Sequence, residues 1–412
     1  MSKVNELIQQ YTSDALEIRR HIHRHPELSM EEKNTTEFIS QQLLKYGIEI
    51  SDIPFKSGVL GILKGGENGH TILLRADIDA LPMVEKSGLP FTSENTGVCH
   101  SCGHDIHTTA LLLAARVLTS LRDELKGTVL FLFQPAEERL SGSQMVIDSG
   151  VFENYHPDFA VGLHCWPDIP AGTIGIRRGS FMASSDTVKL TIRGKGGHGA
   201  HPHKSIDPVM TSAYILTELQ TIISRTIAPL DSAVLTIGKI TGGTAANIIP
   251  DEVVMEGTVR TVSNETRALM EEKIRQIVSH GAAAMGGECD IVYQKGVPAV
   301  VCDNHVVDLI EQAATEELGA DHVVTLATPS MGSEDFSRYL EKVPGAMFRI
   351  GTRNDDPASS RPLHNAGIVF DEQAITSGAS VFAGLALTYH LIPLLPPGHG
   401  CTPEVQNYPD FT

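Results

Sequence analysis

Long hydrophobic runs are absent from this sequence. No apolar run approaches the roughly 20 residues that a helix needs to span a bilayer. The longest candidates, 110–115 and 384–395, are too short or are interrupted by His390 and Pro393. Residues 1–14 are polar and favour a helix, and they lack the apolar core of a signal peptide. We therefore expect a soluble, cytoplasmic protein that makes no contact with a membrane.

Basic residues are also scarce. Lys and Arg total 32 against 50 Asp and Glu, which gives a formal net charge of −18. A protein that binds nucleic acid by neutralising phosphates does not normally carry this balance, so we expect no nucleic-acid partner. A disulfide framework is missing as well, because the six cysteines are scattered without regular spacing. We interpret most of them as small buried side chains in a reducing compartment.

The length and pattern of the chain predict two domains. A chain of 412 residues suits two compact units. Helix-like and strand-like segments alternate before 184 and after 295, which predicts an α/β fold with a mostly parallel central sheet flanked by helices. The segment 184–295 has the pattern of a smaller α+β unit. We therefore predict a catalytic, metal-binding domain formed by 1–183 and 296–412, with a lid or dimerisation domain, 184–295, inserted into it.

The expected elements can be placed along the chain. Residues 4–23 have the apolar spacing of a helix, and Ser29 with Glu32 resembles a capping box that begins a second helix, which ends near Gly47. Further helices are expected at 106–121, 206–225, 264–285, 305–318, 334–340 and 374–390. Strands are expected at 61–63, 71–74, 128–133, 159–163, 187–193, 233–240, 252–261, 290–293 and 347–350. The Pro- and Gly-rich tail beyond Pro393 is expected to carry no chemistry.

Chemically active side chains follow the apolar runs. Asp77 and Asp79 come after one predicted strand, Glu137 and Glu138 after the next, and His164 ends a third. In parallel sheets ligands bind at the carboxyl ends of the strands, where the loops begin. We therefore expect these three segments to meet at one site.

A second cluster lies at 100–107, where the letters HSCGHDIH hold three His, one Cys and one Asp. Cys102 and His104 are two residues apart, so in an extended backbone both side chains point the same way and can reach one metal cluster. The alternative is a helix cap, with Asp105 as the capping residue and the imidazoles in solvent.

Adjacent carboxylates at 137 and 138 suit a division of labour in metal-assisted hydrolysis. Because neighbouring residues at a strand end point to different sides, one can hold a metal ion while the other takes a proton from water. The alternative is a pair of solvated loop residues. His164 and His364 are weak signals alone, because a lone histidine is more often a hydrogen-bonded structural residue.

Taken together, the motifs resemble a known family. In order, they are RADIDALP at 75–82, CGHD at 102–105, QPAEE at 134–138, GLH at 162–164, GGH at 196–198, NIIP at 247–250, MGSEDF at 331–336 and LHN at 363–365. They resemble the amidohydrolase branch of the aminoacylase and carboxypeptidase-type metallopeptidases, which includes hippurate hydrolases, N-acyl-L-amino-acid amidohydrolases and auxin-conjugate hydrolases. The resemblance extends from HRHPE at 23–27 to about residue 390.

The resemblance implies a centre of two divalent metal ions and a role for each matching residue. The implied metal ligands are Cys102, His104, Glu138, His164 and His364. Glu137 matches the general base that activates the metal-bound water and later protonates the leaving amine. Asp79 matches a carboxylate that orients a ligand.

Three further positions match residues of the inserted domain. His198 matches a histidine that reaches the active site of a partner subunit and stabilises the oxyanion, which implies a homodimer or a higher homo-oligomer. Asn247 and Arg260 match positions associated with the substrate carboxylate and the oxyanion.

Two departures from the wider superfamily affect the expected metal. Asp77 stands where relatives use a histidine ligand, so we do not assign Asp77 to the metal and expect Cys102 to compensate. Ser101 replaces a small apolar residue without consequence for the site. A thiolate ligand fits zinc, with manganese, cobalt or nickel as alternatives.

These residues predict the hydrolysis of an N-acyl-L-amino acid to a carboxylate and a free amino acid. One alternative is a metallo-dipeptidase or carboxypeptidase that acts on short peptides with the same centre. The other is a non-catalytic protein that binds a metal or ligand, which is disfavoured because neither Glu137 nor any ligand is missing.

Overall fold

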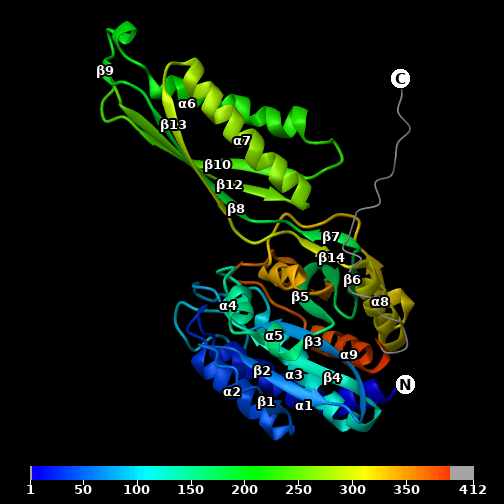
Figure 1. Ribbon diagram of the computed structural model, residues 1–412. Coiled ribbons are helices and arrows are strands. Elements are labelled where there is room, and N and C mark those ends of the chain that lie inside the picture. Colours follow the sequence, from blue (N-terminus) through cyan, green and yellow to red (C-terminus); the bar gives the residue numbers. More distant parts are fainter. Residues whose placement is uncertain (1, 390–412) are drawn as a thin grey trace, which may run out of the picture.

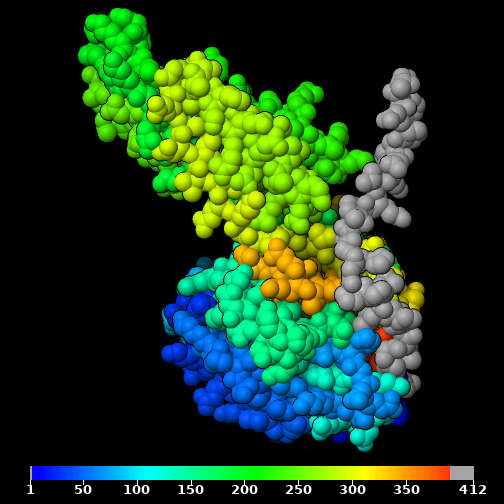
Figure 2. Space-filling view, viewed as in Figure 1, coloured from blue at the N-terminus to red at the C-terminus, as the bar shows by residue number. Residues whose placement is uncertain are grey.

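The computed structural model describes residues 2–389 and shows two lobes joined by a narrow waist (Figures 1 and 2). The small lobe comprises the elements from β8 to β13, and the large lobe comprises the rest. Each lobe has its own cluster of buried apolar side chains. The expectation that the tail beyond Pro393 carries no chemistry concerns residues outside the described range.

The large lobe is built on an eight-stranded sheet in the order β1-β2-β4-β3-β5-β16-β6-β15. Its central strands are parallel to their neighbours, from β4 through β3 and β5 to β16. The mixed α/β class with a mostly parallel sheet is therefore confirmed. The strands of this lobe are β1 (Glu49–Ile50), β2 (Val59–Lys64), β3 (Glu67–Asp77), β4 (Lys126–Gln134), β5 (Phe159–Pro170), β6 (Ile174–Ile176), β7 (Gly179–Met182), β14 (Val300–Cys302), β15 (Val323–Thr325) and β16 (Gly345–Arg353).

Helices cover this sheet, and the apolar α3 packs against α1 and α9. None of the helices within 2–389 is long and apolar enough to cross a membrane. The helices of the large lobe are α1 (Lys3–Arg24), α2 (Lys33–Lys45), α3 (His104–Ser120), α4 (Gly142–Asp148), α5 (Val151–Tyr155), α8 (Asn304–Leu318) and α9 (Gln373–Thr388), with short turns η1 (Arg122–Glu124), η4 (Ala320–His322), η5 (Asp335–Glu341) and η6 (Pro357–Ser360).

The small lobe is a four-stranded antiparallel sheet in the order β10-β12-β8-β13, with α6 and α7 packed on one face (Figure 1). Val188, Leu190 and Ile192 alternate along β8 and face these helices in the core of the lobe. Its elements are β8 (Asp186–Arg193), β9 (Gly197–His198), η2 (Pro202–Lys204), α6 (Pro208–Thr221), η3 (Ile222–Thr226), β10 (Ala233–Gly242), β11 (Ile248–Ile249), β12 (Glu252–Thr261), α7 (Asn264–Ala284) and β13 (Glu288–Lys295).

Three expectations about local structure are wrong. Ser29 and Glu32 form no capping box, because the Ser29 hydroxyl donates to Asp79 and Glu32 makes no side-chain cap bond. The strand expected to end near His164 continues as β5 to Pro170, since its ladder with β16 extends past His164. The helix expected at 334–340 is the 3-10 turn η5.

Candidate metal centre

Three parallel strands bring the predicted site together at one edge of the sheet. β3 ends at Asp77 and β4 ends at Gln134, while His164 lies within β5. Since β3 pairs in parallel with both β4 and β5, residues at or just beyond their carboxyl ends meet. The helix α3 begins at His104 at the same edge, after Gly103 turns the chain with φ of 86°. A side chain at Gly103 would meet the Sγ atom of Cys165 at 2.7 Å.

All five predicted metal ligands lie together. The Sγ atom of Cys102 is 3.6 Å from Nε2 of His164. Oε1 of Glu138 is 3.2 Å from Nε2 of His364 and 3.9 Å from Nε2 of His104. Ligand atoms within 4.8 Å of one another form two overlapping groups, Cys102 with His104 and His164, and Cys102 with Glu138 and His364.

A backbone hydrogen bond fixes the loop of His364, the predicted ligand that is farthest from the others in the sequence. The amide of His364 donates to the carbonyl of Ser101, at 3.0 Å, which ties the loop of His364 to the loop of Cys102. His364 has a φ of 62°, a left-handed backbone that is uncommon outside glycine. Its side chain is half-exposed, whereas the other four ligands are largely buried.

Neighbouring groups orient the imidazole ligands. Nδ1 of His104 lies 3.1 Å from Oδ1 of Asp79, and Nδ1 of His164 lies 2.8 Å from the carbonyl of Cys165. When each Nδ1 carries the proton, each Nε2 presents its lone pair to a metal. Asp79 is itself held by the hydroxyl of Ser29 at 2.6 Å and the backbone amide of Glu138 at 3.0 Å. This geometry agrees with the orienting role predicted for Asp79.

The donor set fits divalent cations. Nε2 of His104 and Oε1 of Glu138 are buried and form no hydrogen bond within 2–389, although Oε1 of Glu138 lies close to Nε2 of His364. Buried polar atoms normally find such a partner, so two convergent orphan ligand atoms indicate a bound group. A thiolate, imidazoles and a carboxylate are the ligands that zinc and other borderline ions take in proteins. The cluster at 100–107 is therefore more than a helix cap. The carboxylates at 137 and 138 are largely buried and are not a pair of solvated loop residues.

Glu137 lies beside the ligands as a buried carboxyl group. Its Oε2 is 4.0 Å from Nε2 of His104, and the residue is only 5% exposed. Burial raises the pKa of Glu137 well above its usual range, and the carboxylates of Glu334 and Glu138 raise it further. A carboxyl group with a raised pKa can hold a proton between taking it from water and passing it on.

The imidazoles differ in their electrostatic surroundings. Burial alone would lower the pKa of His104, but Asp77, Asp79 and Glu138 raise it to about 10. Burial lowers the pKa of His164 to about 4, so that its imidazole is neutral at pH 7 and able to bind a metal. The site therefore concentrates negative charge around His104, where a cation is favourable.

Both carboxylate oxygens of Asp77 contact protein side chains. Its Oδ2 accepts from Nη1 of Arg75 at 2.7 Å, and its Oδ1 lies 2.5 Å from Nδ1 of His107. His107 cannot turn away, because its Nε2 accepts from the backbone amide of Cys165 at 2.7 Å. These contacts support leaving Asp77 out of the ligand set.

Glu334, which has no role predicted from the sequence, is buried next to Glu137. One oxygen, Oε1, accepts from Nη2 of Arg75 at 3.0 Å, whereas Oε2 is buried without a partner among the described residues. Oxygen atoms of Glu334, Glu137 and Asp77 approach within 4.8 Å. The motif MGSEDF at 331–336 was the only sequence feature that pointed to Glu334. Its residue types do not show that this segment returns to the edge of the sheet where the metal ligands lie.

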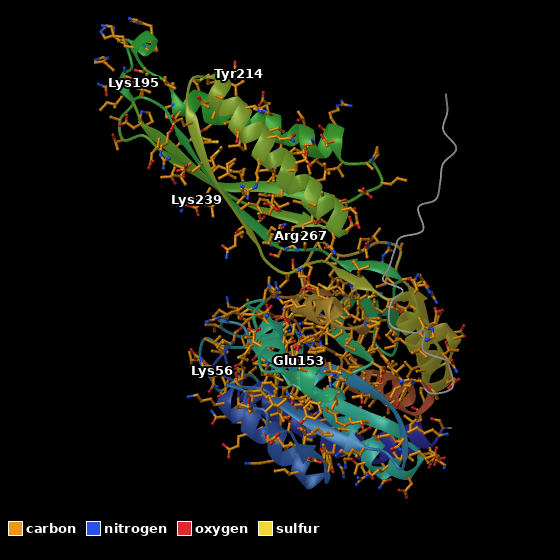
Figure 3. All side chains as sticks on the ribbon, in the orientation of Figure 1. Lys56, Glu153, Lys195, Tyr214, Lys239 and Arg267 are labelled. Atoms are coloured by element: carbon orange, nitrogen blue, oxygen red, sulfur yellow. The ribbon has the colours of Figure 1, made fainter. Side chains whose placement is uncertain are left out.

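His198 and Asn247 lie far from the metal centre of their own chain. The short strands β9 and β11 pair His198 with Ile248, and the amide of Gly199 donates to the carbonyl of Asn247 at 2.8 Å. Figure 1 places β9 at the end of the small lobe that is farthest from the large lobe, and Figure 3 places nearby Lys195 there too. His198 is exposed.

Arg260 lies elsewhere in the small lobe. It is near the end of β12, and its guanidinium contacts the hydroxyl of Ser185 at the waist. The neighbouring Thr261 accepts from the backbone amide of Ser184 at 2.7 Å. Within one chain, Arg260 thus lies apart from Asn247. The resemblance had associated both residues with the region of the substrate carboxylate and the oxyanion.

Comparison with known proteins identifies the family. The model for peptidase family M20/M25/M40 matches residues 73–388. The N-acetyl-L-cysteine deacetylase of Bacillus subtilis is 43% identical over 87% of this chain and 84% of its own length. Thermostable carboxypeptidase 1 of Saccharolobus solfataricus is 36% identical over 91% of this chain and 95% of its own length.

A solved structure agrees with this assignment. The crystal structure of a dinuclear metal-binding peptidase of the M20 family from Bacillus subtilis superimposes with a TM-score of 0.82 and 37% identity, covering 93% of this chain and 99% of that one. This solved structure and the present chain therefore share one fold over nearly their whole lengths. The chain belongs to peptidase family M20/M25/M40 and is a metal-dependent amidohydrolase.

Proposed function

We propose that the protein hydrolyses the amide bond of N-acyl-L-amino acids, such as N-acetyl or N-benzoyl derivatives, to a carboxylate and a free amino acid. The observation that carries this proposal is the buried carboxyl group of Glu137 beside five convergent ligands. A relative at 43% identity is named as a deacetylase of an N-acetyl amino acid.

We further propose that Cys102, His104, Glu138, His164 and His364 hold two divalent ions, with zinc as the expected metal and manganese, cobalt or nickel as alternatives. When bound, such ions lower the pKa of water and polarise the amide carbonyl. Glu137 then accepts the proton of the attacking water and delivers it to the nitrogen of the leaving amine. Asp79 keeps the imidazole of His104 turned toward the site.

The active form is proposed to be at least a homodimer. His198 is exposed at the far end of the small lobe and does not approach the metal ligands of its own chain (Figure 1). In a dimer it would donate a hydrogen bond to the developing oxyanion in the partner's site. Asn247 lies beside it and is proposed to contact the substrate from the same tip, whereas Arg260 is proposed to act from the waist.

A second candidate is the hydrolysis of short peptides. The relative named as a carboxypeptidase, at 36% identity over most of both chains, favours it. The two reactions share their metal centre and base, and they differ in whether the substrate carries an acyl group or a free amino group.

A substrate panel tests both reactions. The purified protein is assayed with N-acetyl-, N-benzoyl- and dipeptide substrates of one amino acid, with Zn²⁺ or Mn²⁺ added and the bound metal quantified. We expect the N-acyl substrates to be hydrolysed faster. A preference for the dipeptide would favour the second reaction, and metal binding without turnover of any substrate would indicate a binding protein.

A further inference from the structure

Arg349 is a buried cation whose polar atoms lack partners. The residue is 5% exposed, and its Nε and Nη2 atoms are buried without a hydrogen-bond partner within the described part of the chain. Burial lowers the pKa of Arg349 to about 10, so the guanidinium is still charged at neutral pH. A buried charge is costly unless it is paired, and the buried Arg19 and Arg75 are both paired with carboxylates. The carboxylate of Asp168 raises the pKa of Arg349 and the cation of Arg177 lowers it, but neither forms an ion pair with Arg349 within the described residues. Unlike Arg19 and Arg75, Arg349 is therefore left without a bound anion.

The strand register places Arg349 on the active-site face of the sheet. On β16, Arg349 is directly opposite the metal ligand His164 of the parallel strand β5. Trp166 is two residues beyond His164, so its side chain shares that face, and the two ring centroids are 6.3 Å apart. Arg349, Trp166 and His164 thus form a continuous strip of side chains that leads away from the metal centre.

Aromatic rings fix the plane of this guanidinium. Its central carbon lies 3.5 Å from the ring centroid of Trp166 and 5.0 Å from that of Phe181. Stacking of this kind orients a guanidinium while its N–H groups remain free to bond in the plane. A planar fork of N–H donors matches a carboxylate, which accepts two parallel hydrogen bonds from it.

We propose that Arg349, stacked on Trp166, binds the free carboxylate of the substrate. This role restricts the enzyme to amides whose amine half carries a carboxylate, and it excludes neutral amides. The inference rests on the proposed function. It assigns the carboxylate to the large lobe, beside the metal ligands, and leaves Asn247 and Arg260 to the oxyanion region.

Matched substrates test this role. The pair is an N-acetyl-L-amino acid and its α-carboxamide, which have the same scissile bond and the same side chain. In Arg349→Met we expect the KM for the acid to rise by roughly 10- to 100-fold while the KM for the carboxamide stays nearly constant. Arg349→Lys, which keeps the charge but not the fork, should give an intermediate KM for the acid.

The control is Arg353→Met, because Arg353 lies on the same strand but is exposed. This variant should leave both KM values unchanged. An equal change for the acid and the carboxamide in Arg349→Met would overturn the proposal and show that the arginine only supports the fold. If the methionine variant does not fold, the lysine variant decides by the same comparison.

Fluorescence provides a readout that does not depend on turnover. Trp166 is the single tryptophan of the chain, so its emission reports directly on the stacked guanidinium. The acid should change this emission saturably, the carboxamide should not, and Arg349→Met should abolish the response to the acid. A response to the acid that persists in Arg349→Met would contradict the proposal.

The two proposals can fail separately. If the wild type hydrolyses neither substrate, the proposed function fails, and the fluorescence titration still decides whether Arg349 binds a carboxylate. If the wild type hydrolyses the acid and Arg349→Met does so with an unchanged KM, only the carboxylate site is wrong.

Discussion

Nε2 of His364 lies 3.2 Å from Oε1 of Glu138, and the two residues come from loops that only the folded sheet brings together. Glu138 follows β4 in the N-terminal half of the chain, whereas His364 belongs to a loop after β16 in the C-terminal half. The small lobe is inserted between them in the sequence. A metal ion held by both residues would therefore fasten together the two parts of the large lobe.

Replacing Glu137 with Gln should separate catalysis from metal binding. The amide keeps the shape of the side chain but cannot accept a proton, so kcat should fall by roughly 10²- to 10⁴-fold. Metal content, measured by elemental analysis, should stay at the wild-type level, since the five ligands are unchanged. Glu153→Gln, on an exposed part of α5, serves as the control. Turnover close to that of the wild type would refute the role of Glu137 as the base.

Asp79→Asn should weaken metal binding without removing a ligand. The carboxylate of Asp79 holds Nδ1 of His104 and receives the hydroxyl of Ser29 and the amide of Glu138. Loss of such an orienting group typically reduces metal affinity by about 10- to 100-fold. A chelator competition measures the affinity, with Asp148→Asn on α4 as a control that lies outside the site. Unchanged affinity would show that His104 does not depend on Asp79.

Mixing two inactive variants tests the shared active site. Glu137→Ala lacks the base and His198→Ala lacks the tip histidine, so each homodimer should be inactive. After subunit exchange, a mixed dimer contains one complete site, and the mixture should recover roughly a quarter of wild-type activity. Exchange is verified by mass spectrometry of the intact dimer. Verified exchange without recovery would contradict a site completed by the partner.

The pH dependence of stability should report on His23. Its Nδ1 lies 2.8 Å from Oδ2 of Asp105 and its Nε2 lies 3.0 Å from Oε1 of Glu85. Burial alone would lower the pKa of His23, but these carboxylates raise it above its ordinary value. The folded protein therefore holds this proton more tightly than the unfolded chain. The stabilisation is complete below the unfolded pKa of about 6.5 and is lost as the pH rises through the folded value.

Urea unfolding measures this effect. From about pH 6.5 upward, the free energy of unfolding of the wild type should fall relative to that of His23→Gln. The exposed His280→Gln, on α7, should follow the wild type across the same range. Parallel curves for His23→Gln and the wild type would show that the His23 proton does not contribute to stability.

Much of the site could be read from residue types and their spacing. Asp79, Glu137 and Glu138 follow buried strands, and parallel strands place such positions at one edge. The pair Cys102 and His104 astride a glycine identified the second cluster. The strand-end inference rests on local backbone geometry, which the sequence controls directly. Cys102 and His104 do lie together, but not through the extended backbone expected, because Gly103 is left-handed and His104 begins α3.

A prediction from local spacing was wrong where the side chains bind residues that are distant in the sequence. Ser29 and Glu32 have the spacing of a capping box, yet the hydroxyl of Ser29 binds Asp79. The carboxylate of Glu32 accepts from the hydroxyl of Ser57 and from the backbone amide of Ala136, both at 2.8 Å. Glu32 thereby holds the turn that precedes Glu137. Once tertiary contacts offer stronger bonds in a buried site, they replace the local cap.

By itself the sequence determined the class of fold, because periodicity acts over a few residues, and its resemblance to a known family supplied the proposed ligands and the proposed base. Only the tertiary structure decided which residues share a space. It placed Glu334 behind Glu137, separated Asn247 from Arg260, and set Arg349 opposite His164 on a neighbouring strand. Sheet order and register determine these neighbours, and both depend on packing over the whole chain.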